Sequence, residues 1–242
     1  MFEIGCIVDI GTVREQNDDR ASICGNYIEE GKHAFKAESV TAMVFDGVGG
    51  EAFGGEAAEI AALQMNGLTP DNCNEAMIMD YVKRANDAIL EKQKADALHA
   101  RMATTVAGIC LQNDDFMSFN VGDSKIYRIR GPFVMKLSED HTLSNELRTL
   151  GLEPSEAQQH TITRFLGGTR YTPEIMDGRE RSFEQDLFVL CTDGVSDVIE
   201  DEELASMIDR NRTPLENCQA IIDCAIDRES SDNLSIVIIR RI

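Results

Sequence analysis

The amino-acid sequence predicts an α+β fold built on antiparallel β-sheets. Short β-rich runs follow one another directly in the middle of the chain, at residues 104–111, 115–121, 125–130 and 133–137. Turn signals separate them, at Asn113-Asp114, Gly122-Asp123 and Gly131-Pro132. Consecutive strands joined by short turns indicate a meander, and the helical segments are grouped around it. This grouping is typical of α+β folds and not of a regular βαβ repeat.

The first part of the chain contains two predicted strands followed by two predicted helices. Residues 2–9 place apolar side chains at every second position, which is the strand period, and residues 39–45 form a buried-strand run. Helical patterns cover residues 54–66 and about 73–94. For the longer helix we expect Asn72 as the N-cap and Glu75 as the third helical residue.

The last part of the chain alternates helices with two further strands. A helix near residues 142–150 ends at Gly151, and two more helices are expected at 201–209 and 214–227. The last of these begins with Thr213, Pro214 and Glu216 as N-cap, first and third residues. Strands are predicted at residues 186–192 and 234–239.

Length and composition are those of one globular domain, which we expect to span residues 1–242. Hydrophobic residues make up 43% and charged residues 27%, enough apolar side chains for a substantial core. No apolar run approaches the roughly 20 residues needed to cross a bilayer. The N-terminus, MFEIGCIVDIG, lacks the features of a signal peptide, so we expect a cytoplasmic protein without a membrane partner.

The formal charge of −20 argues against a nucleic-acid partner. Proteins that bind nucleic acids neutralise phosphates with Lys and Arg, and this chain has 23 basic residues against 43 acidic ones. High negative charge favours solubility, and part of it is available to hold cations. The seven cysteines are odd in number and lie mostly in apolar runs, which indicates core residues more than disulfides or zinc ligands.

Aspartates stand at the ends of the predicted strands, often beside glycine. They are Asp18, Asp19, Asp46, Asp123, Asp193, Asp197 and Asp232. Strand ends can bring residues distant in sequence into one cleft, and a cluster of carboxylates needs either protons or cations. Oxygen donors select magnesium, manganese or calcium. Taken singly, each Asp-Gly pair also fits ordinary turn chemistry, so the joint occurrence carries the metal-site hypothesis.

These motifs, in their order along the chain, resemble those of the metal-dependent protein phosphatases, the type 2C family. The similar segments are GTVREQNDDR, VFDGVGGEAFGGEAA, ATTVAGI, FNVGDSKIYRIR, LSEDHTLSNEL, ITRFLGG, VLCTDGVSDVI and SDNLSIVII. The similarity covers residues 5–240, and the bacterial branch that consists of the catalytic domain alone is the best match. The resemblance implies a four-layer αββα sandwich of two antiparallel β-sheets flanked by helices.

The resemblance also implies roles for individual residues. Asp46 would bridge two metal ions, and Gly47 would offer its backbone carbonyl to one of them. Arg14 would bind the substrate phosphate. The remaining ligands would be Asp193 and Asp232 at the first ion, Asp18 and Asp19 at the second, mostly through water, and Asp123 with Asp193 at a third, weaker site.

The activity that the resemblance implies is metal-dependent dephosphorylation of phosphoserine and phosphothreonine in proteins. Two Mn²⁺ or Mg²⁺ ions would activate a water that attacks the phosphate monoester. The expected partners are phosphorylated proteins, a cognate Ser/Thr kinase and its substrates, and the expected state is a monomer. Two features depart from the family pattern. Val48 stands where many members have a histidine, and the acidic motif reads Asn-Asp-Asp where Asn-Glu-Asp is commoner.

Residues 164–185 correspond to a flap beside the active site of bacterial relatives. Arg164, Arg170, Arg179 and Arg181 make this segment basic, which fits either contact with a phosphoprotein or a solvated loop. We expect Arg164 to contact substrate, and we expect His141 to be structural or close to substrate and not catalytic.

Three other functions are alternatives to the phosphoprotein phosphatase. A family member without activity could serve as a metal-holding binding module, although such proteins typically lose ligand aspartates that this chain retains. A small-molecule phosphomonoesterase would use the same metal site. Gly47, Gly49 and Ala52 also fit a dinucleotide-binding pattern, but the βαβ context that this pattern requires is missing.

Overall fold

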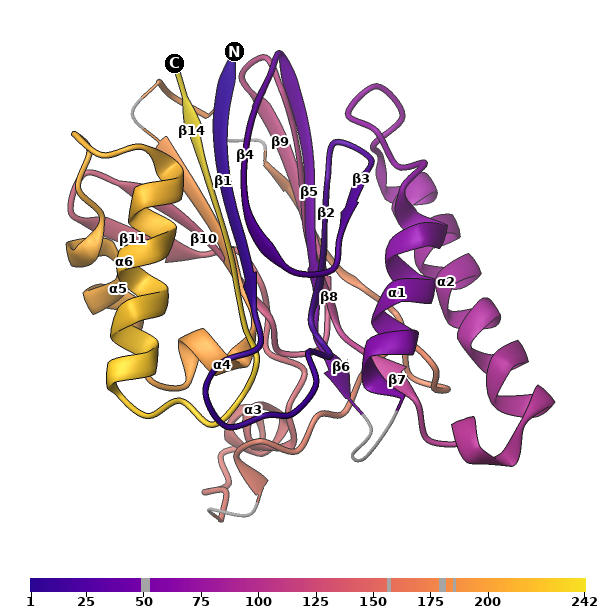
Figure 1. Ribbon diagram of the computed structural model, residues 1–242. Coiled ribbons are helices and arrows are strands. Elements are labelled where there is room, and N and C mark those ends of the chain that lie inside the picture. The colour runs from indigo at the N-terminus through magenta and orange to yellow at the C-terminus, as the bar shows by residue number, and fades with distance from the viewer. Residues whose placement is uncertain (49–52, 156–157, 179–181, 185) are drawn as a thin grey trace.

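Two six-stranded antiparallel sheets pack face to face and are covered by helices on both outer sides (Figure 1). The structure is a computed structural model, and it describes residues 1–48, 53–155, 158–178, 182–184 and 186–242. The four-layer αββα sandwich expected from the resemblance is therefore the fold of this chain.

The first sheet contains both ends of the chain. Its order is β11-β10-β13-β14-β1-β4. The strands are β1 (Phe2–Asp9), β4 (Gly31–Ala37), β10 (Lys125–Arg130), β11 (Phe133–Lys136), β13 (Asp186–Cys191) and β14 (Leu234–Arg241). Helices α5 (Asp201–Met207) and α6 (Pro214–Asp227) lie on its outer face, and the short α4 (Asp193–Ser196) follows β13.

The second sheet has the order β12-β9-β8-β5-β2-β3. Its strands are β2 (Arg20–Ile23), β3 (Asn26–Ile28), β5 (Ser39–Phe45), β8 (Val106–Gln112), β9 (Asp115–Val121) and β12 (Glu174–Gly178). Helices α1 (Gly54–Met65) and α2 (Glu75–Ala95) cover it. A two-stranded pair, β6 (Gly47–Val48) and β7 (Ala103–Thr104), lies beyond the ends of the inner strands β5 and β8. The remaining described elements are a 3-10 turn (Ala97–His99) and α3 (Leu143–Thr149).

Three apolar layers follow from the strand period of two. On β1, Cys6 and Val8 face the layer between the sheets, whereas Ile7 faces the layer under α5 and α6. On β5, Val44 faces the central layer and Met43 faces the layer under α1 and α2. Each inner strand is therefore buried on both faces, which explains the continuous apolar runs in the sequence.

The predicted meander is wrong at its centre. Strand β9 pairs with β8 and β12, whereas β10 pairs with β11 and β13, so the four runs are divided between the two sheets. The chain crosses from one sheet to the other at Gly122-Asp123, which is not a hairpin turn. Gly122 has φ +109°, and a Cβ there would lie 2.5 Å from the Thr105 Cγ2 atom. Only glycine accommodates this crossing.

Helix ends agree with the sequence more closely than the sheet pairing does. Helix α6 has the predicted capping box, in which the Glu216 backbone amide donates to Thr213 and the Glu216 side chain accepts from the Thr213 amide. Helix α3 ends before Gly151, as predicted. The N-cap of α2 is Asn74 and not Asn72, because Asn74 Oδ1 accepts from the Met77 amide at 3.0 Å.

No helix in the described part of the chain is both long and apolar enough to span a membrane.

Candidate metal centre

The aspartates singled out in the sequence gather at one end of the sandwich, where strands of both sheets terminate. Asp46 follows β5, Asp193 follows β13 and Asp232 precedes β14. The charges that act on Asp46 come from Asp193, Asp19, Asp123 and Asp232, in decreasing order of effect. Strand ends from both sheets thus bring together carboxylates that are up to 213 residues apart, from Asp19 to Asp232.

Asp46 is held at its backbone by the strand that precedes β8. Its carbonyl oxygen accepts from the Thr104 hydroxyl and the Thr105 amide, each at 2.8 Å. Its own amide donates to Thr105 Oγ1 at 3.2 Å. These contacts leave the carboxylate free to point into the cluster. Burial, followed by the charge of Asp193, raises the pKa of Asp46 well above its usual value.

Gly47 fits against the start of α1 only because it has no side chain. A Cβ on Gly47 would lie 2.3 Å from the Gly54 carbonyl carbon and 2.6 Å from the Asp18 carbonyl oxygen. A Cβ on Gly54 would in turn lie 2.5 Å from the Gly47 carbonyl oxygen. The glycines of this segment therefore allow three backbone segments to approach one another beside Asp46.

Asp18 and Asp19 have different surroundings, although they are neighbours. Asp18 Oδ1 accepts from the Gly55 amide at 2.8 Å, at the positive end of α1. Asp19 is 2% exposed and accepts from the Thr192 hydroxyl at 2.8 Å. Burial raises the pKa of Asp19 to about 7, against the opposing effect of hydrogen bonds from Ser235 and Thr192.

Asp193, which is half-buried, and Asp123, which is buried, complete the cluster. Burial, then the charges of Asp232 and Asp197, raise the pKa of Asp193 to about 6, and a side-chain hydrogen bond with Asp46 opposes this shift. Burial, then the charge of Asp193, raise the pKa of Asp123 to about 8. The Asp123 Oδ1 atom is buried and has no hydrogen-bond partner in the described structure. A buried oxygen without a partner is costly unless a proton or a cation satisfies it.

Arg14 lies at the open edge of the cluster. Its Nη2 atom lies 2.7 Å from Asp232 Oδ2, its Nε donates to the Ser231 carbonyl at 3.2 Å, and its side chain is half exposed. Of the predicted site residues, Arg14 thus joins the aspartates.

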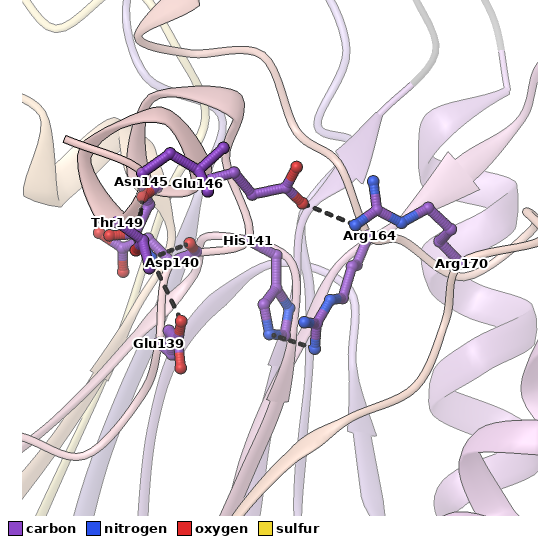
Figure 2. A pocket seen from close by; sticks show the side chains of 9 residues that line it. Glu139, Asp140, His141, Asn145, Glu146, Thr149, Arg164 and Arg170 are labelled. Atoms are coloured by element: carbon purple, nitrogen blue, oxygen red, sulfur yellow. Dashed lines mark hydrogen bonds and ion pairs between the residues drawn. The ribbon is translucent and has the colours of Figure 1, made fainter. Parts of the chain in front are cut away.

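Arg164 lies on the flap side instead. Its Nη1 atom is 3.2 Å from His141 Nε2, in a cavity of about 340 Å³ that also contains Arg170 and Glu146 (Figure 2). Arg170 forms an ion pair with Glu146 at 2.7 Å. Among the described residues, no contact joins Arg164 to the aspartate cluster. Arg179 and Arg181, also predicted to make the flap basic, lie outside the described residues, as do Gly49 and Ala52 of the dinucleotide-like pattern.

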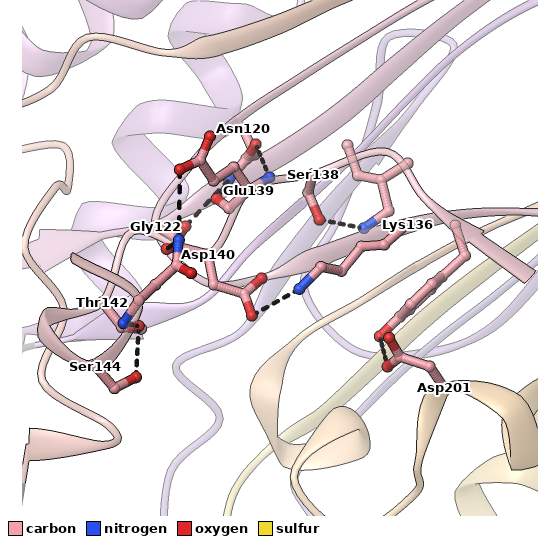
Figure 3. A network of polar contacts seen from close by, with 12 residues as sticks. Asn120, Gly122, Lys136, Ser138, Glu139, Asp140, Thr142, Ser144 and Asp201 are labelled. Carbon is pink, nitrogen blue, oxygen red and sulfur yellow. Dashed lines mark hydrogen bonds and ion pairs between the residues drawn. The ribbon is translucent and has the colours of Figure 1, made fainter. Parts of the chain in front are cut away.

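His141 supports the crossing that carries Asp123. The Gly122 amide donates to His141 Nδ1 at 3.0 Å, and the His141 amide donates to the Gly122 carbonyl at 3.0 Å. Burial, then the nearby Arg164, lower the pKa of His141 to about 4. The imidazole is therefore neutral at pH 7, which fits a structural role. Asn120 secures the same crossing, because its Nδ2 donates to the Gly122 and Glu139 carbonyls (Figure 3).

Asn233 is a residue of the centre that sequence reasoning missed. It is 3% exposed, its Nδ2 donates to the Ile10 and Gln16 carbonyls, and its Oδ1 accepts from the Asp18 amide at 2.9 Å. One amide side chain thus fixes the loop that carries Arg14 and Asp18. The signal in the sequence was its place beside Asp232 at the start of a strand.

The donor set fits hard divalent cations. Every candidate ligand is an oxygen, the buried Asp19 and Asp123 lie with half-buried carboxylates, and Asp123 has an unsatisfied oxygen. Among the residues that the structure describes, no three acidic, histidine or cysteine side chains already converge as a metal-binding group. Arg14 instead pairs with Asp232, and Asp46 shares a hydrogen bond with Asp193.

Comparison with known proteins agrees with this architecture. The family model described as Protein phosphatase 2C matches residues 24–227. The chain is 24% identical to the serine/threonine phosphatase stp of Listeria innocua, over 96% of this chain and 93% of that protein. It is 24% identical to the protein phosphatase PhpP of Streptococcus pneumoniae, over 98% and 97%.

Solved structures share the fold. The serine/threonine phosphatase Stp1 from Staphylococcus aureus superposes with a TM-score of 0.86 at 21% identity, covering 99% of this chain and 95% of that chain. The catalytic domain of PstP in complex with two manganese ions superposes with a TM-score of 0.81 at 23% identity, covering 99% of each chain. Because the family model matches most of the chain, this protein belongs to the protein phosphatase 2C family.

Proposed function

We propose that this protein is a metal-dependent phosphatase that removes phosphate from phosphoserine and phosphothreonine residues of proteins, with Mn²⁺ or Mg²⁺ as its cofactor. The observation that carries the proposal is the group of buried and half-buried aspartates at the end of the sandwich, whose pKa values are raised by removal from water and by one another. Such a group gains most from divalent cations, which replace the protons that it otherwise needs. Family membership and the names of the relatives support the phosphoprotein substrate.

The residues that would hold the ions follow from the geometry and the resemblance together. We assign two ions to Asp46, the Gly47 carbonyl, Asp193 and Asp232, with Asp18 and Asp19 acting mostly through water. We assign a third, weaker site to Asp123 with Asp193. When bound, divalent ions activate water at neutral pH and neutralise charge on the transferring phosphoryl group. Thr104 and Thr105 keep the Asp46 backbone fixed, so that little reorganisation is needed when ions bind.

Arg14 is the candidate for binding the phosphate group. Its guanidinium is already at the edge of the cluster, half exposed and adjacent to Asp232. A guanidinium can bind two phosphate oxygens as a fork, which an ammonium group does not reproduce. We predict that Arg14→Lys raises KM and lowers kcat/KM about tenfold or more, the loss expected when one charged hydrogen bond of about 1.5–3 kcal/mol is removed. Steady-state kinetics on a phosphothreonine peptide measure this, and wild-type kcat/KM in the variant would contradict the role.

The wider setting is proposed on the same basis. We infer that the protein acts in the cytoplasm as a monomer on phosphorylated proteins, and that a Ser/Thr kinase and its substrates are its partners. The high negative charge disfavours nucleic acid as a partner. Arg164, in the cavity beside α3, is the candidate for contact with the phosphoprotein outside the metal centre.

Phosphate release from a phosphothreonine peptide is the decisive test. It would be measured with Mn²⁺, with Mg²⁺ and with EDTA, and Asp193→Asn would serve as the control that retains the shape of the side chain. Release that requires metal and is lost in the variant supports the proposal. If Mn²⁺ binds by calorimetry without any release from the peptide, the binding module or a small-molecule phosphomonoesterase replaces it. Release from p-nitrophenyl phosphate alone would favour the phosphomonoesterase.

A further inference from the structure

A second cavity, of about 530 Å³, lies directly beside the candidate metal centre. Val48 lines it, two residues after Asp46, and opposite Val48 stand Arg101, Met102 and Ala103 of the segment that leads into β7. The third wall is the segment from His160 to Thr169. We refer to this hollow as the Arg101 cavity.

The walls of the Arg101 cavity are fixed by hydrogen bonds to two side chains of α2. Gln93 Nε2 donates to the carbonyls of both Met102 and Gly167, each at 2.8 Å, and so holds two walls at once. Asn86, which is buried, accepts from the amides of Gly167 and Gly168. A binding site that is already formed costs less conformational entropy when a ligand enters it.

The same walls connect the cavity to the aspartate cluster. Leu166 and Thr104 exchange backbone hydrogen bonds at 2.9 and 3.1 Å, and the Thr104 hydroxyl donates to the Asp46 carbonyl. On the other side, His160 lines the cavity and its Nδ1 lies 3.2 Å from Asp197 Oδ2. Asp197 in turn acts on Asp193 through its charge. A substrate bound at the aspartates therefore has this cavity as its immediate neighbour.

The lining combines an apolar floor with one guanidinium. Val48, Ile162 and Phe165 are half-buried and supply apolar surface. Arg101 is exposed, and within the described part of the chain no carboxylate lies within ion-pair distance of it. In a chain with a formal charge of −20, an exposed guanidinium in this cavity favours a negatively charged ligand group, as Arg14 does at the edge of the centre.

We propose that the Arg101 cavity binds the residues that flank the phosphorylated residue of a protein substrate, taking one apolar side chain and placing an acidic side chain against Arg101. This inference rests on the proposed phosphoprotein phosphatase activity and names the sequence around its target. Arg101 is four residues from Thr105, whose amide donates to Asp46, so its backbone lies at most about 14 Å from that point. An extended peptide covers this length in about four residues. The acidic residue therefore belongs within four positions of the phosphoresidue.

A panel of phosphothreonine peptides tests this proposal. An aspartate or a lysine is moved through each of the four positions on either side of the phosphothreonine, in an otherwise neutral peptide with Mn²⁺ present. The readout is the ratio of kcat/KM for the aspartate peptide over the lysine peptide at each position. We expect a ratio of about two- to fivefold at one or two adjacent positions, the size of one exposed ion pair. A second series replaces a serine next to the phosphothreonine by leucine, for which we expect a higher kcat/KM.

Substitutions of Arg101 test whether the preference for aspartate over lysine comes from the cavity. Arg101→Gln should bring the aspartate-to-lysine ratio close to one, and Arg101→Glu should reverse it in favour of lysine. Arg212→Gln is the matched control, because Arg212 is another exposed arginine, close to the start of α6, and its ratio should stay at the wild-type value.

The proposal is overturned if the wild-type ratio of kcat/KM is near one at every position, or if Arg101→Gln lowers kcat/KM equally for the aspartate and lysine peptides. If leucine leaves kcat/KM unchanged, the cavity does not bind an apolar side chain. If neither the peptides nor p-nitrophenyl phosphate release phosphate with Mn²⁺, the proposed function has failed before the cavity is tested.

Discussion

The buried amide of Asn233 shows how the centre depends on residues outside the set of candidate metal ligands, because its polar atoms bond to the backbone. It fixes two backbone carbonyls of the loop after β1 and the amide of Asp18. Gly194 allows this packing, because a Cβ there would lie 2.0 Å from the Asn233 carbonyl oxygen. The aspartates therefore hold their positions through backbone contacts made by small and amide residues around them.

Gly47 gives the clearest prediction for a single residue. In Gly47→Ala the new methyl group would meet backbone atoms of Gly54 and Asp18, which cannot move like the end of a flexible side chain. We expect the free energy of unfolding to fall by about 1–3 kcal/mol, as for an overpacked site. We also expect weaker Mn²⁺ binding by calorimetry, since the neighbouring Asp46 shifts with its backbone.

Gly131→Ala is the control for that measurement. Gly131 has φ +59° but nothing lies within 4 Å of the position of a Cβ. Its replacement costs stability through backbone strain alone, about 1–2 kcal/mol, and leaves Mn²⁺ affinity unchanged. Equal Mn²⁺ affinities of the two variants would mean that the close approach at Gly47 does not position the metal ligands.

Among the elements, most long inner strands were predicted, whereas three of the four edge strands and the short inner strand β2 were missed; the edge strand β11 was predicted at residues 133–137. β1, β5, β13 and β14 lie inside the sheets and appear as apolar runs in the sequence. β4 forms an edge of its sheet with alternately exposed residues such as Lys32 and Lys36, so its composition is that of a loop. β12 is an edge strand as well, inside the segment predicted as a flap.

The crossing at Gly122 could not be distinguished from a hairpin, because the two flanking runs have the same strand pattern and only their partners differ. The clustering of the aspartates was predictable because a strand end is visible in the sequence. The contacts of Asn233 and Arg101 depend on tertiary structure, which no local pattern contains. The resemblance placed the expected ligands, and their roles stay predictions until metal binding is measured.

Thr213 gives a prediction at the level of one helix. Its hydroxyl accepts from the Glu216 amide at the start of α6, and α6 packs on β1 and β14 through Cys218 and Ile222. Thr213→Ala should lower the free energy of unfolding by about 0.5–2 kcal/mol in urea denaturation, with kcat/KM unchanged. Ser206→Ala, in α5, removes a hydroxyl that, within the described part of the chain, bonds to the Glu203 carbonyl of the same helix, and it should change stability by less than about 0.5 kcal/mol. A loss in Thr213→Ala no greater than in Ser206→Ala would contradict the importance of the cap.

For the whole molecule, the aspartate cluster makes stability depend on pH and on metal. The pKa of Asp193 is raised to about 6, that of Asp19 to about 7 and that of Asp123 to about 8, from a usual value of 3.8. Between the unfolded pKa of 3.8 and the raised folded pKa of each group, the folded state binds more protons than the unfolded state. The free energy of unfolding therefore falls as pH rises over this interval. The stabilising contribution is fully present below the unfolded value and is lost as pH rises through about 6 to 8.

Thermal unfolding in EDTA should therefore give a Tm that falls between pH 5 and pH 8. At pH 7.5, Mn²⁺ at about 100 times its Kd should raise Tm by roughly 5–10 °C, because such binding adds about 2.7 kcal/mol and each kcal/mol shifts Tm by about 2–4 °C in a chain of this size. Asp123→Asn should reduce the dependence of Tm on pH in EDTA, because one of the carboxyl groups with a raised pKa no longer titrates. Asp71→Asn, on the exposed surface, should leave this dependence unchanged. A Tm in EDTA that rises from pH 5 to pH 8 would mean that these carboxylates do not take up protons on folding, and the need for cations at this end of the sandwich would lose its physical basis.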